Sequence, residues 1–283
     1  MFLNLYKIFF LPLLPFLHLW DVPQHDAGQT ITVIVHGTKP PERVAHVFNV
    51  VHKFFYTPQG LHTATLVDNS YRFGKIVRML NESDPREFPL ENVYLFGWSG
   101  ALSPQERREA AERLYDGLRE VLRGYPATTK VRVITHSHGG NVVLNLPLVQ
   151  KDKPFRIIVD ELVLLACPVQ QQTAENLKNP MFREIIACYS KNDILQIIDL
   201  QGMHKENESQ RKHGSLFSKR RFKKQDNLVQ ARIKSRGWDL AHIEFLLPHF
   251  IKKLPKTVNA IKSKRDKFQS RFPDKNIIEI QKL

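Results

Sequence analysis

The chain has 283 residues, of which 42% are hydrophobic and 25% are charged, and its formal net charge at pH 7 is +14. This length and apolar content predict a single domain with a sizeable core. A disulfide-rich scaffold is excluded, because the only two cysteines, Cys167 and Cys188, each lie in or at the end of an apolar run and are predicted core side chains. The pair His136 and His138 lacks a second ligand pair at metal spacing, so we expect no metal.

The first twenty residues carry a single charge, Lys7, ahead of an apolar run, and they resemble the n-region and h-region of a secretory signal. Pro12 and Pro15 interrupt any helix there, and the apolar run is shorter than the roughly 20 residues that span a bilayer. Residues 1–27 are therefore predicted to be a signal peptide, an interfacial anchor or an apolar arm packed on the domain. We favour export or membrane association over a cytoplasmic location.

Residues 29–35 alternate in polarity and are rich in β-branched side chains, a pattern that predicts a central strand. The strand ends in His36-Gly37-Thr38, where the glycine lets the backbone turn so that an N–H can face a site. A plain strand-to-loop turn is the alternative interpretation. Pro40 and Pro41 then predict the start of a helix over residues 42–56.

A helix is predicted near residues 73–81 and another strand over residues 92–96. Ser99 follows that strand and is a rival nucleophile, but its flanking glycines stand two residues before and one after it, which is the wrong spacing. We therefore interpret Ser99 as a loop residue. Ser103 is the predicted N-cap of a helix that continues to about residue 123, with Glu106 completing a capping box.

The rest of the chain is organised around residues 131–144, where an apolar β-branched run leads through small residues into apolar residues at helical spacing. This pattern predicts a strand, a tight turn and a helix, with Ser137 in the turn. A serine there stands at the carboxyl end of a sheet, and the next N–H points, with the helix N-terminus, toward an incoming oxyanion. Gly139 and Gly140 supply the small residues that the turn needs, and Thr135 stands where a glycine is usual.

The run Thr135-His136-Ser137-His138-Gly139-Gly140, together with the upstream Val33-Ile34-Val35-His36-Gly37-Thr38, resembles the α/β-hydrolase superfamily in its lipase and esterase branch. The resemblance extends over roughly residues 30–252. It implies an α/β-hydrolase fold, with a mainly parallel central sheet and helices on both faces. It also implies that the N–H of Thr38, set by the Gly37 turn, joins that of His138 as an oxyanion hole. Trp98 is then a candidate substrate-binding residue, with core packing as the alternative.

Two further strands are predicted at residues 162–165 and 184–189. Their alternation with helical stretches favours a mainly parallel sheet, in which ligands bind at the carboxyl ends of the strands. Asp193 comes just after the second of these strands and matches the acid position of the resembled family. Asp199 is its competitor but lies a turn or more beyond the strand end. A plain turn residue is the alternative interpretation of Asp193.

His242 is the predicted general base, because it follows a predicted strand over residues 227–234 and opens an apolar helix. The order Ser137, Asp193, His242 is the one that α/β-hydrolases use. A solvent-facing His242 without a catalytic role is the alternative. The other histidines fit less well, since they lie inside the following helix, in a polar segment without a strand, or beside the oxyanion turns: His249, His204, His213, His36 and His138.

Nearly all of the net charge is C-terminal, because residues 201–283 carry +13 of the total. One basic block is the insertion 201–226, between the predicted acid and base. The other is the tail 253–283, in which Val258, Ile261 and Phe268 form one helical stripe. Both blocks could bind an anionic membrane surface. The alternative for the insertion is a solvated lid loop, and the alternative for the tail is a helix docked on the domain. No specific nucleic acid partner is expected, since no recognised binding motif is present.

These residues predict a serine hydrolase, built on a domain over residues 28–252, that cleaves a carboxylic ester through an acyl-enzyme and needs no cofactor. A lipid or other acyl ester is the favoured substrate. Two alternatives stay open. One is a soluble thioesterase or small-molecule carboxylesterase, and the other is an inactive hydrolase-like protein that binds acidic membranes or nucleic acid.

Overall fold

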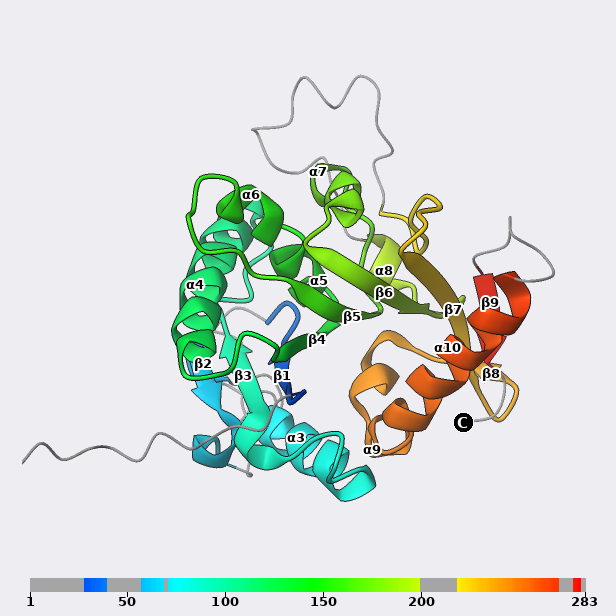
Figure 1. Ribbon diagram of the computed structural model, residues 1–283. Coiled ribbons are helices and arrows are strands. Elements are labelled where there is room, and N and C mark those ends of the chain that lie inside the picture. Colours follow the sequence, from blue (N-terminus) through cyan, green and yellow to red (C-terminus); the bar gives the residue numbers. More distant parts are fainter. Residues whose placement is uncertain (1–27, 40–56, 69–70, 199–217, 270–276, 281–283) are drawn as a thin grey trace, which may run out of the picture.

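The computed structural model describes residues 28–39, 57–68, 71–198, 218–269 and 277–280 (Figure 1). The N-terminal segment 1–27 and the predicted helix 42–56 lie outside these residues, as do Asp199, His204 and His213. The strands are β1 (Thr30–Val35), β2 (Gly60–Thr63), β3 (Val93–Gly97), β4 (Lys130–His136), β5 (Val159–Leu165), β6 (Phe182–Tyr189), β7 (Leu228–Ser235), β8 (Trp238–Asp239) and β9 (Ile277–Ile280). The α-helices are α3 (Arg72–Ser83), α4 (Pro104–Arg123), α5 (Gly139–Val143), α6 (Leu146–Gln150), α7 (Gln171–Ala174), α8 (Leu195–Ile198), α9 (Pro248–Ile251) and α10 (Leu254–Gln269).

The strands form one sheet in the order β2-β3-β1-β4-β5-β6-β7-β8, with β9 also paired to β7. All neighbouring strands run parallel except β2, which pairs antiparallel with β3, and β8, which pairs antiparallel with β7. The predicted α/β fold with a mainly parallel sheet is therefore confirmed. The strand order reverses at β1, because the chain places β3 on one side of β1 and then β4 on the other. Ligands of such sheets bind at this reversal, outside the carboxyl ends of the strands.

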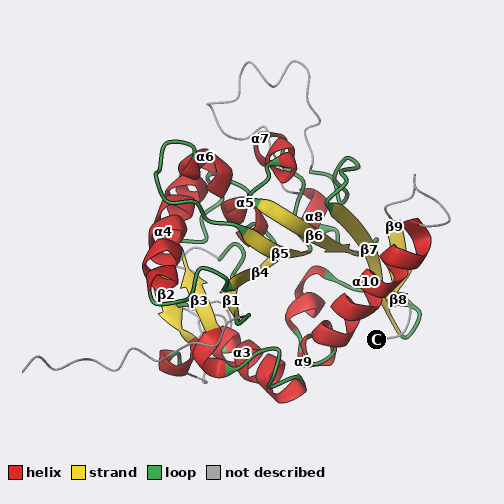
Figure 2. Ribbon diagram, in the orientation of Figure 1, coloured by secondary structure: helices red, strands yellow, loops and turns green. Residues whose placement is uncertain are grey.

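Helices cover both faces of the sheet (Figures 1 and 2). Because side chains alternate along a strand, successive residues of β1 enter different apolar layers. Val33 and Val35 belong to the layer that contains residues of α4 and α6, whereas Ile34 belongs to the layer that contains residues of α3 and α10. The central strands are thus buried on both faces, which holds their carboxyl ends in fixed positions.

The strands predicted from the sequence are confirmed as β1, β3, β4, β5, β6 and β7, and the predicted helices near residues 73–81 and 103–123 as α3 and α4. Ser103 caps α4, since its side chain accepts a hydrogen bond from the Glu106 N–H at 3.3 Å. The second half of the predicted capping box is wrong. The Glu106 carboxylate instead accepts a hydrogen bond from Ser99 Oγ at 2.9 Å, because the loop after β3 reaches the start of α4.

The C-terminal helix that was predicted from the sequence is α10, and it packs on the sheet. Val258 and Ile261 of α10 are buried in the same apolar layer as α3, while the side chain of Phe268 lies outside the described part of the chain. The strand β9 was not predicted, and it adds a parallel strand beside β7. The division of the chain at residue 252 stays a prediction, although α10 and β9 pack on the same sheet as the residues before them.

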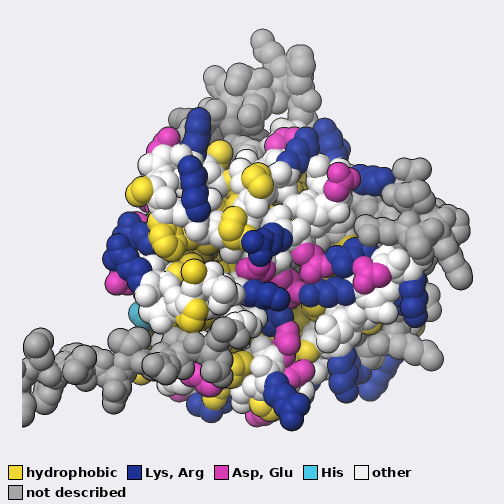
Figure 3. All heavy atoms as spheres, in the orientation of Figure 1, with side chains coloured by type: hydrophobic (Ala, Val, Ile, Leu, Met, Phe, Trp, Pro, Cys, Tyr) yellow, Lys and Arg dark blue, Asp and Glu magenta, His cyan; other side chains and the backbone are white. Residues whose placement is uncertain are grey.

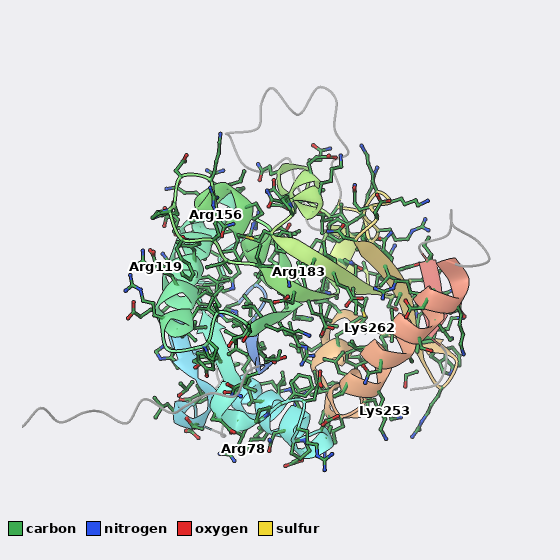
Figure 4. The ribbon with its side chains drawn as sticks, viewed as in Figure 1. Arg78, Arg119, Arg156, Arg183, Lys253 and Lys262 are labelled. Atoms are coloured by element: carbon green, nitrogen blue, oxygen red, sulfur yellow. The ribbon has the colours of Figure 1, made fainter. Side chains whose placement is uncertain are left out.

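Ion pairs connect α10 to three adjacent strands. Glu161 on β5 contacts Arg132 on β4, with Nε and Oε1 2.6 Å apart, and also contacts Lys262 on α10. Lys262 also lies 3.3 Å from a carboxylate oxygen of Glu184 on β6. Figure 4 labels Lys262, and around that position the space-filling view in Figure 3 shows basic and acidic side chains intermixed. These contacts hold α10 against the sheet.

Candidate active site

Ser137 stands in the turn between β4 and α5 with a backbone φ of +53°. Residues with a side chain rarely adopt this left-handed conformation, and such strain is typical of a nucleophilic serine on a strand-to-helix elbow. The Ser137 N–H donates to the carbonyl oxygen of Leu165 at 2.9 Å, which joins the turn to the end of β5. The predicted strand, turn and helix are confirmed, and the nucleophilic role of Ser137 stays a prediction.

Two glycines after the elbow allow α5 to pack closely. A Cβ on Gly139 would lie 2.5 Å from the carbonyl oxygen of His36, and a Cβ on Gly140 would lie 2.5 Å from Cys167 Sγ. Neither distance leaves room for a larger residue. On the other side of the elbow Thr135 is buried, so a threonine fits where a glycine is usual. Both cysteines are buried, as predicted.

Gly37 brings the end of β1 against the elbow. A Cβ on Gly37 would lie 2.7 Å from the Cβ of Ser137, so the two turns are in direct contact and only a glycine fits. Thr38 follows at the end of β1, and His138 is the N-cap residue of α5. The Thr38 hydroxyl oxygen is buried and has no hydrogen-bond partner among the described residues.

His36 and Trp98 link the ends of β1 and β3. The backbone N–H of Trp98 donates to His36 Nε2 at 3.0 Å, so the proton of the neutral ring is on Nδ1, which donates to the Gly37 carbonyl oxygen at 2.6 Å. The Trp98 indole donates to the His36 carbonyl oxygen at 2.8 Å, and the two rings stack. Burial and the nearby Lys39 hold the pKa of His36 well below its ordinary value. The pair therefore fixes the turn that carries Gly37.

Trp98 is fully buried. Its hydrogen bond and stacking partner in the described residues is His36, which matches the core-packing interpretation, and contact of Trp98 with a substrate stays a prediction.

Ser99 is exposed in the loop after β3, and its hydroxyl donates to Glu106 rather than to a histidine. His249 lies on α9 with 42% of its side chain exposed.

Asp193 and His242 come together although 49 residues separate them. The Nδ1–H of His242 donates to Oδ2 of Asp193 at 2.8 Å, and the Asp193 side chain is fully buried. The other oxygen, Oδ1, accepts the N–H of Gln196 at 2.9 Å, so both carboxylate oxygens are held. His242 opens the 3₁₀ helix η5 (His242–Leu246), and a separate helix, α9, begins at Pro248 after Leu247; the single apolar helix predicted here is therefore wrong.

His136 was not predicted to contact the base. Its Nε2 donates to the carbonyl oxygen of His242 at 3.1 Å, and the two ring centroids lie 4.7 Å apart. Burial, reinforced by the neighbouring His242, lowers the pKa of His136 to about 3, so the ring is neutral at pH 7. Because His136 directly precedes Ser137, this contact holds the main chain of His242 beside the elbow.

Asn141 on α5 was not predicted either. Its Nδ2 donates to the Pro168 carbonyl oxygen at 3.0 Å and lies 3.4 Å from Nδ1 of His138. Its Oδ1 accepts the hydroxyl of Thr173 at 2.5 Å. Asn141 is completely buried, and it ties the first turn of α5 to the loop after β5. A buried amide at this place carries no pattern in the sequence that would have marked it.

The described residues contain no cluster of three or more His, Cys, Asp or Glu side chains able to hold a metal ion. Within the same residues, none of the helices combines the length and the apolarity that a membrane crossing requires.

No protein-family model matches the chain, and no curated protein matches it. Among solved structures, it is similar to phospholipase PlaB from Legionella pneumophila, with a TM-score of 0.30 and 19% identity over 50% of this chain and 25% of that chain. The structure of phospholipase PlaB in complex with thio-NAD has a TM-score of 0.30 and 17% identity over 52% of this chain and 27% of that one. The chain spans about a quarter of the length of the PlaB chains, and the likeness does not assign it to a family.

Proposed function

We propose that the chain is a serine hydrolase that cleaves a carboxylic ester, with Ser137 as nucleophile, His242 as general base and Asp193 as the acid that orients it. The hydrogen bond between Asp193 and His242, at the sheet edge that carries the Ser137 elbow, is the observation that carries this proposal. A serine hydroxyl is a poor nucleophile until a base takes its proton, and the base needs an anionic partner to set its tautomer.

The geometry supports the required tautomer. Because Nδ1–H of His242 donates to Asp193, Nε2 of the neutral ring is the nitrogen that accepts a proton. In the proposed reaction Ser137 Oγ attacks the ester carbonyl carbon and its proton passes to His242 Nε2. That proton then goes to the leaving alcohol as the bond between the carbonyl carbon and the alkoxy oxygen breaks. Water next attacks the acyl-enzyme, and His242 again takes and returns a proton.

The N–H groups of His138 and Thr38 are proposed to stabilise the oxyanion. Contact between Gly37 and Ser137 supports this, since it brings the end of β1 to the nucleophile. The hydroxyl of Thr38, which has no partner among the described residues, is a further polar group at that turn. A buried hydroxyl without a partner costs about 1–3 kcal/mol, which a bound substrate oxygen would offset.

Labelling with a fluorophosphonate probe tests the proposal, because such probes react only with an activated serine. We expect the wild-type protein to be labelled and the Ser137→Ala variant to lose labelling. Ser99→Ala is the matched control, since Ser99 lies in a loop at the same edge of the sheet, and it should be labelled as the wild type is. Absence of labelling in folded wild-type protein, or loss of labelling only in Ser99→Ala, contradicts the proposal.

A chain-length series of acyl esters distinguishes the substrate classes. Hydrolysis that increases with acyl length favours a lipid ester, whereas a preference for short acyl groups or for thioesters favours the soluble enzyme considered above. Binding of acidic vesicles without hydrolysis of any ester would instead indicate the inactive binding protein.

A further inference from the structure

Three large apolar side chains are exposed next to the proposed catalytic acid. Ile194 and Leu195, immediately after Asp193, are 61% and 62% exposed, and Ile198 at the end of α8 is 51% exposed. In contrast, Gln196 between them is buried, where its N–H binds Asp193 Oδ1. Helix α8 is therefore anchored through its polar residue and presents its apolar residues to the surroundings, which is the reverse of a helix that packs on a core.

The basic segment 218–223 lies against α8 and is held in place by backbone and side-chain hydrogen bonds. The Ser218 N–H donates to the Ile197 carbonyl oxygen at 3.2 Å, and Lys219 bridges to Val169 in the loop after β5. Arg220 Nε donates to the Asp193 carbonyl oxygen at 3.2 Å. Figure 1 shows this yellow segment near α8 and the start of β7. The segment 218–223 of the basic insertion is thus bound to the loop that carries Asp193 and to α8.

An open hollow of about 860 Å³ lies between the segment 218–223, Ile197 of α8 and residues of β6, β7 and β9, and no Asp or Glu is among the described residues that line it. Five of its lining residues are cationic: Lys191, Lys219, Arg220, Arg221 and Lys223. None of these five forms an ion pair with a carboxylate of the described residues, although Lys223 interacts electrostatically with Glu175, and Arg221 with Tyr189. Several cations around one hollow, whose described lining residues include no carboxylate, attract anions.

We propose that Ile194, Leu195 and Ile198, together with Lys191, Lys219 and Lys223, form a docking surface for a lipid bilayer with anionic headgroups. We call these six residues the α8 surface. The proposal rests on the proposed function and deepens it, because the docked bilayer would present acyl esters to the sheet edge that carries Ser137. Exposed isoleucine and leucine insert at the boundary between headgroups and acyl chains, while the lysines bind the anionic headgroups. A soluble anion would engage the lysines alone, so the apolar side chains favour the bilayer.

Vesicle sedimentation tests the α8 surface, with the Ser137→Ala variant as the parent so that binding is measured without hydrolysis. Vesicles of phosphatidylcholine alone are compared with vesicles that also contain phosphatidylserine. We expect strong binding only with phosphatidylserine. Replacing Lys191, Lys219 and Lys223 by Gln should weaken it about 100-fold, because each cation contributes about fivefold near a charged surface. Replacing Ile194, Leu195 and Ile198 by Ser should weaken it about tenfold or more.

Matched controls come from elsewhere on the surface. Lys75, Arg78 and Arg86 are exposed on and after α3, where Figure 4 labels Arg78, and their replacement by Gln removes the same charge. Leu66 and Leu148 are exposed leucines outside the α8 surface. Their replacement by Ser should leave vesicle binding within twofold of the parent.

Two results overturn the docking proposal: equal loss of binding in the control variants, or unchanged binding in both α8-surface variants. If the lysine variant loses binding but the apolar variant does not, and single-stranded DNA or inorganic phosphate displaces the vesicles, the surface is a general anion site instead. Hydrolysis of a water-soluble short-chain ester, measured with Ser137 present, separates this proposal from the proposed function. The α8-surface variants should retain that hydrolysis, whether or not they bind vesicles.

Discussion

His136 donates a hydrogen bond from Nε2 to the backbone carbonyl oxygen of His242 at 3.1 Å. The residue that precedes the proposed nucleophile therefore holds the main chain of the proposed base. The two histidines are 106 residues apart in the sequence, so this contact joins two distant parts of the chain at the proposed site. His136 touches no reacting atom in the proposed mechanism, and its role is to position His242.

We expect His136→Leu to lower kcat about tenfold with little change in KM, because loss of the hydrogen bond lets His242 move from its productive position. His136→Gln should recover most of kcat, since its amide nitrogen can replace Nε2 as donor. Steady-state kinetics on a soluble ester, with thermal unfolding as a check of folding, measures both. Equal activity of the two variants would show that the hydrogen bond has no positioning role.

Asp193→Asn should lower kcat by about four orders of magnitude, because a carboxamide that donates to Nδ1 forces the proton onto Nε2, where the base must be free. The variant keeps an oxygen for the Gln196 N–H, so its fold should be retained, as circular dichroism would show. Asp199→Asn is the control and should be fully active. If Asp199→Asn is the inactive variant, the acid has been assigned to the wrong residue.

Gly37→Ala should reduce activity at least about 100-fold, because its Cβ would lie 2.7 Å from that of Ser137 and must displace the elbow or the turn. We expect a loss of about 1–3 kcal/mol in the free energy of unfolding from the same overlap. In Gly124→Ala, by contrast, the new Cβ would have its nearest neighbour at 3.5 Å, and both activity and stability should be unaffected. Urea unfolding and ester hydrolysis measure the two quantities, and a fully active Gly37→Ala would disprove the tight contact.

Stability should fall in acid, and Glu161 and His136 both contribute to this fall. Burial opposes ionisation of Glu161, but Arg132 and Lys262 outweigh it and hold its pKa below the ordinary value. The resulting stabilisation is present above about pH 4.5 and is lost as the pH falls through the lowered pKa. The pKa of His136 is lowered to about 3 in the folded protein. Between about pH 6.5 and about pH 3 this histidine is therefore protonated in the unfolded chain but neutral in the folded one, and stability falls as the pH is lowered through this range.

Urea unfolding from pH 8 to pH 3.5 measures this dependence. Glu161→Gln should lose about 3 kcal/mol at pH 7, because it leaves Arg132 and Lys262 without their shared carboxylate. It should also have a flatter profile below about pH 4.5. The control is Glu120→Gln, which removes an exposed ion pair with Arg123 on α4. This substitution should change the free energy of unfolding by less than about 0.5 kcal/mol. An equal effect of both substitutions would contradict a special role for the buried network.

Local patterns were sufficient to predict most of the elements. The β-branched alternation of residues 29–35 and the apolar runs before Ser137 and Asp193 predicted strands that the structure confirms. The small residues around Ser137 predicted its turn. Less could be predicted where an element depends on distant partners, as with β9, which forms by pairing with β7.

By itself, the sequence determined that this chain forms alternating strands and helices with a serine at a tight turn, because those features depend on side chains a few residues apart. Only the tertiary structure decided that Asp193 meets His242, that His136 holds the His242 carbonyl oxygen, and that α8 exposes its apolar residues beside a basic hollow. The order of strands in the sheet brings these residues together, and no periodicity along the chain encodes the distance between two strand ends.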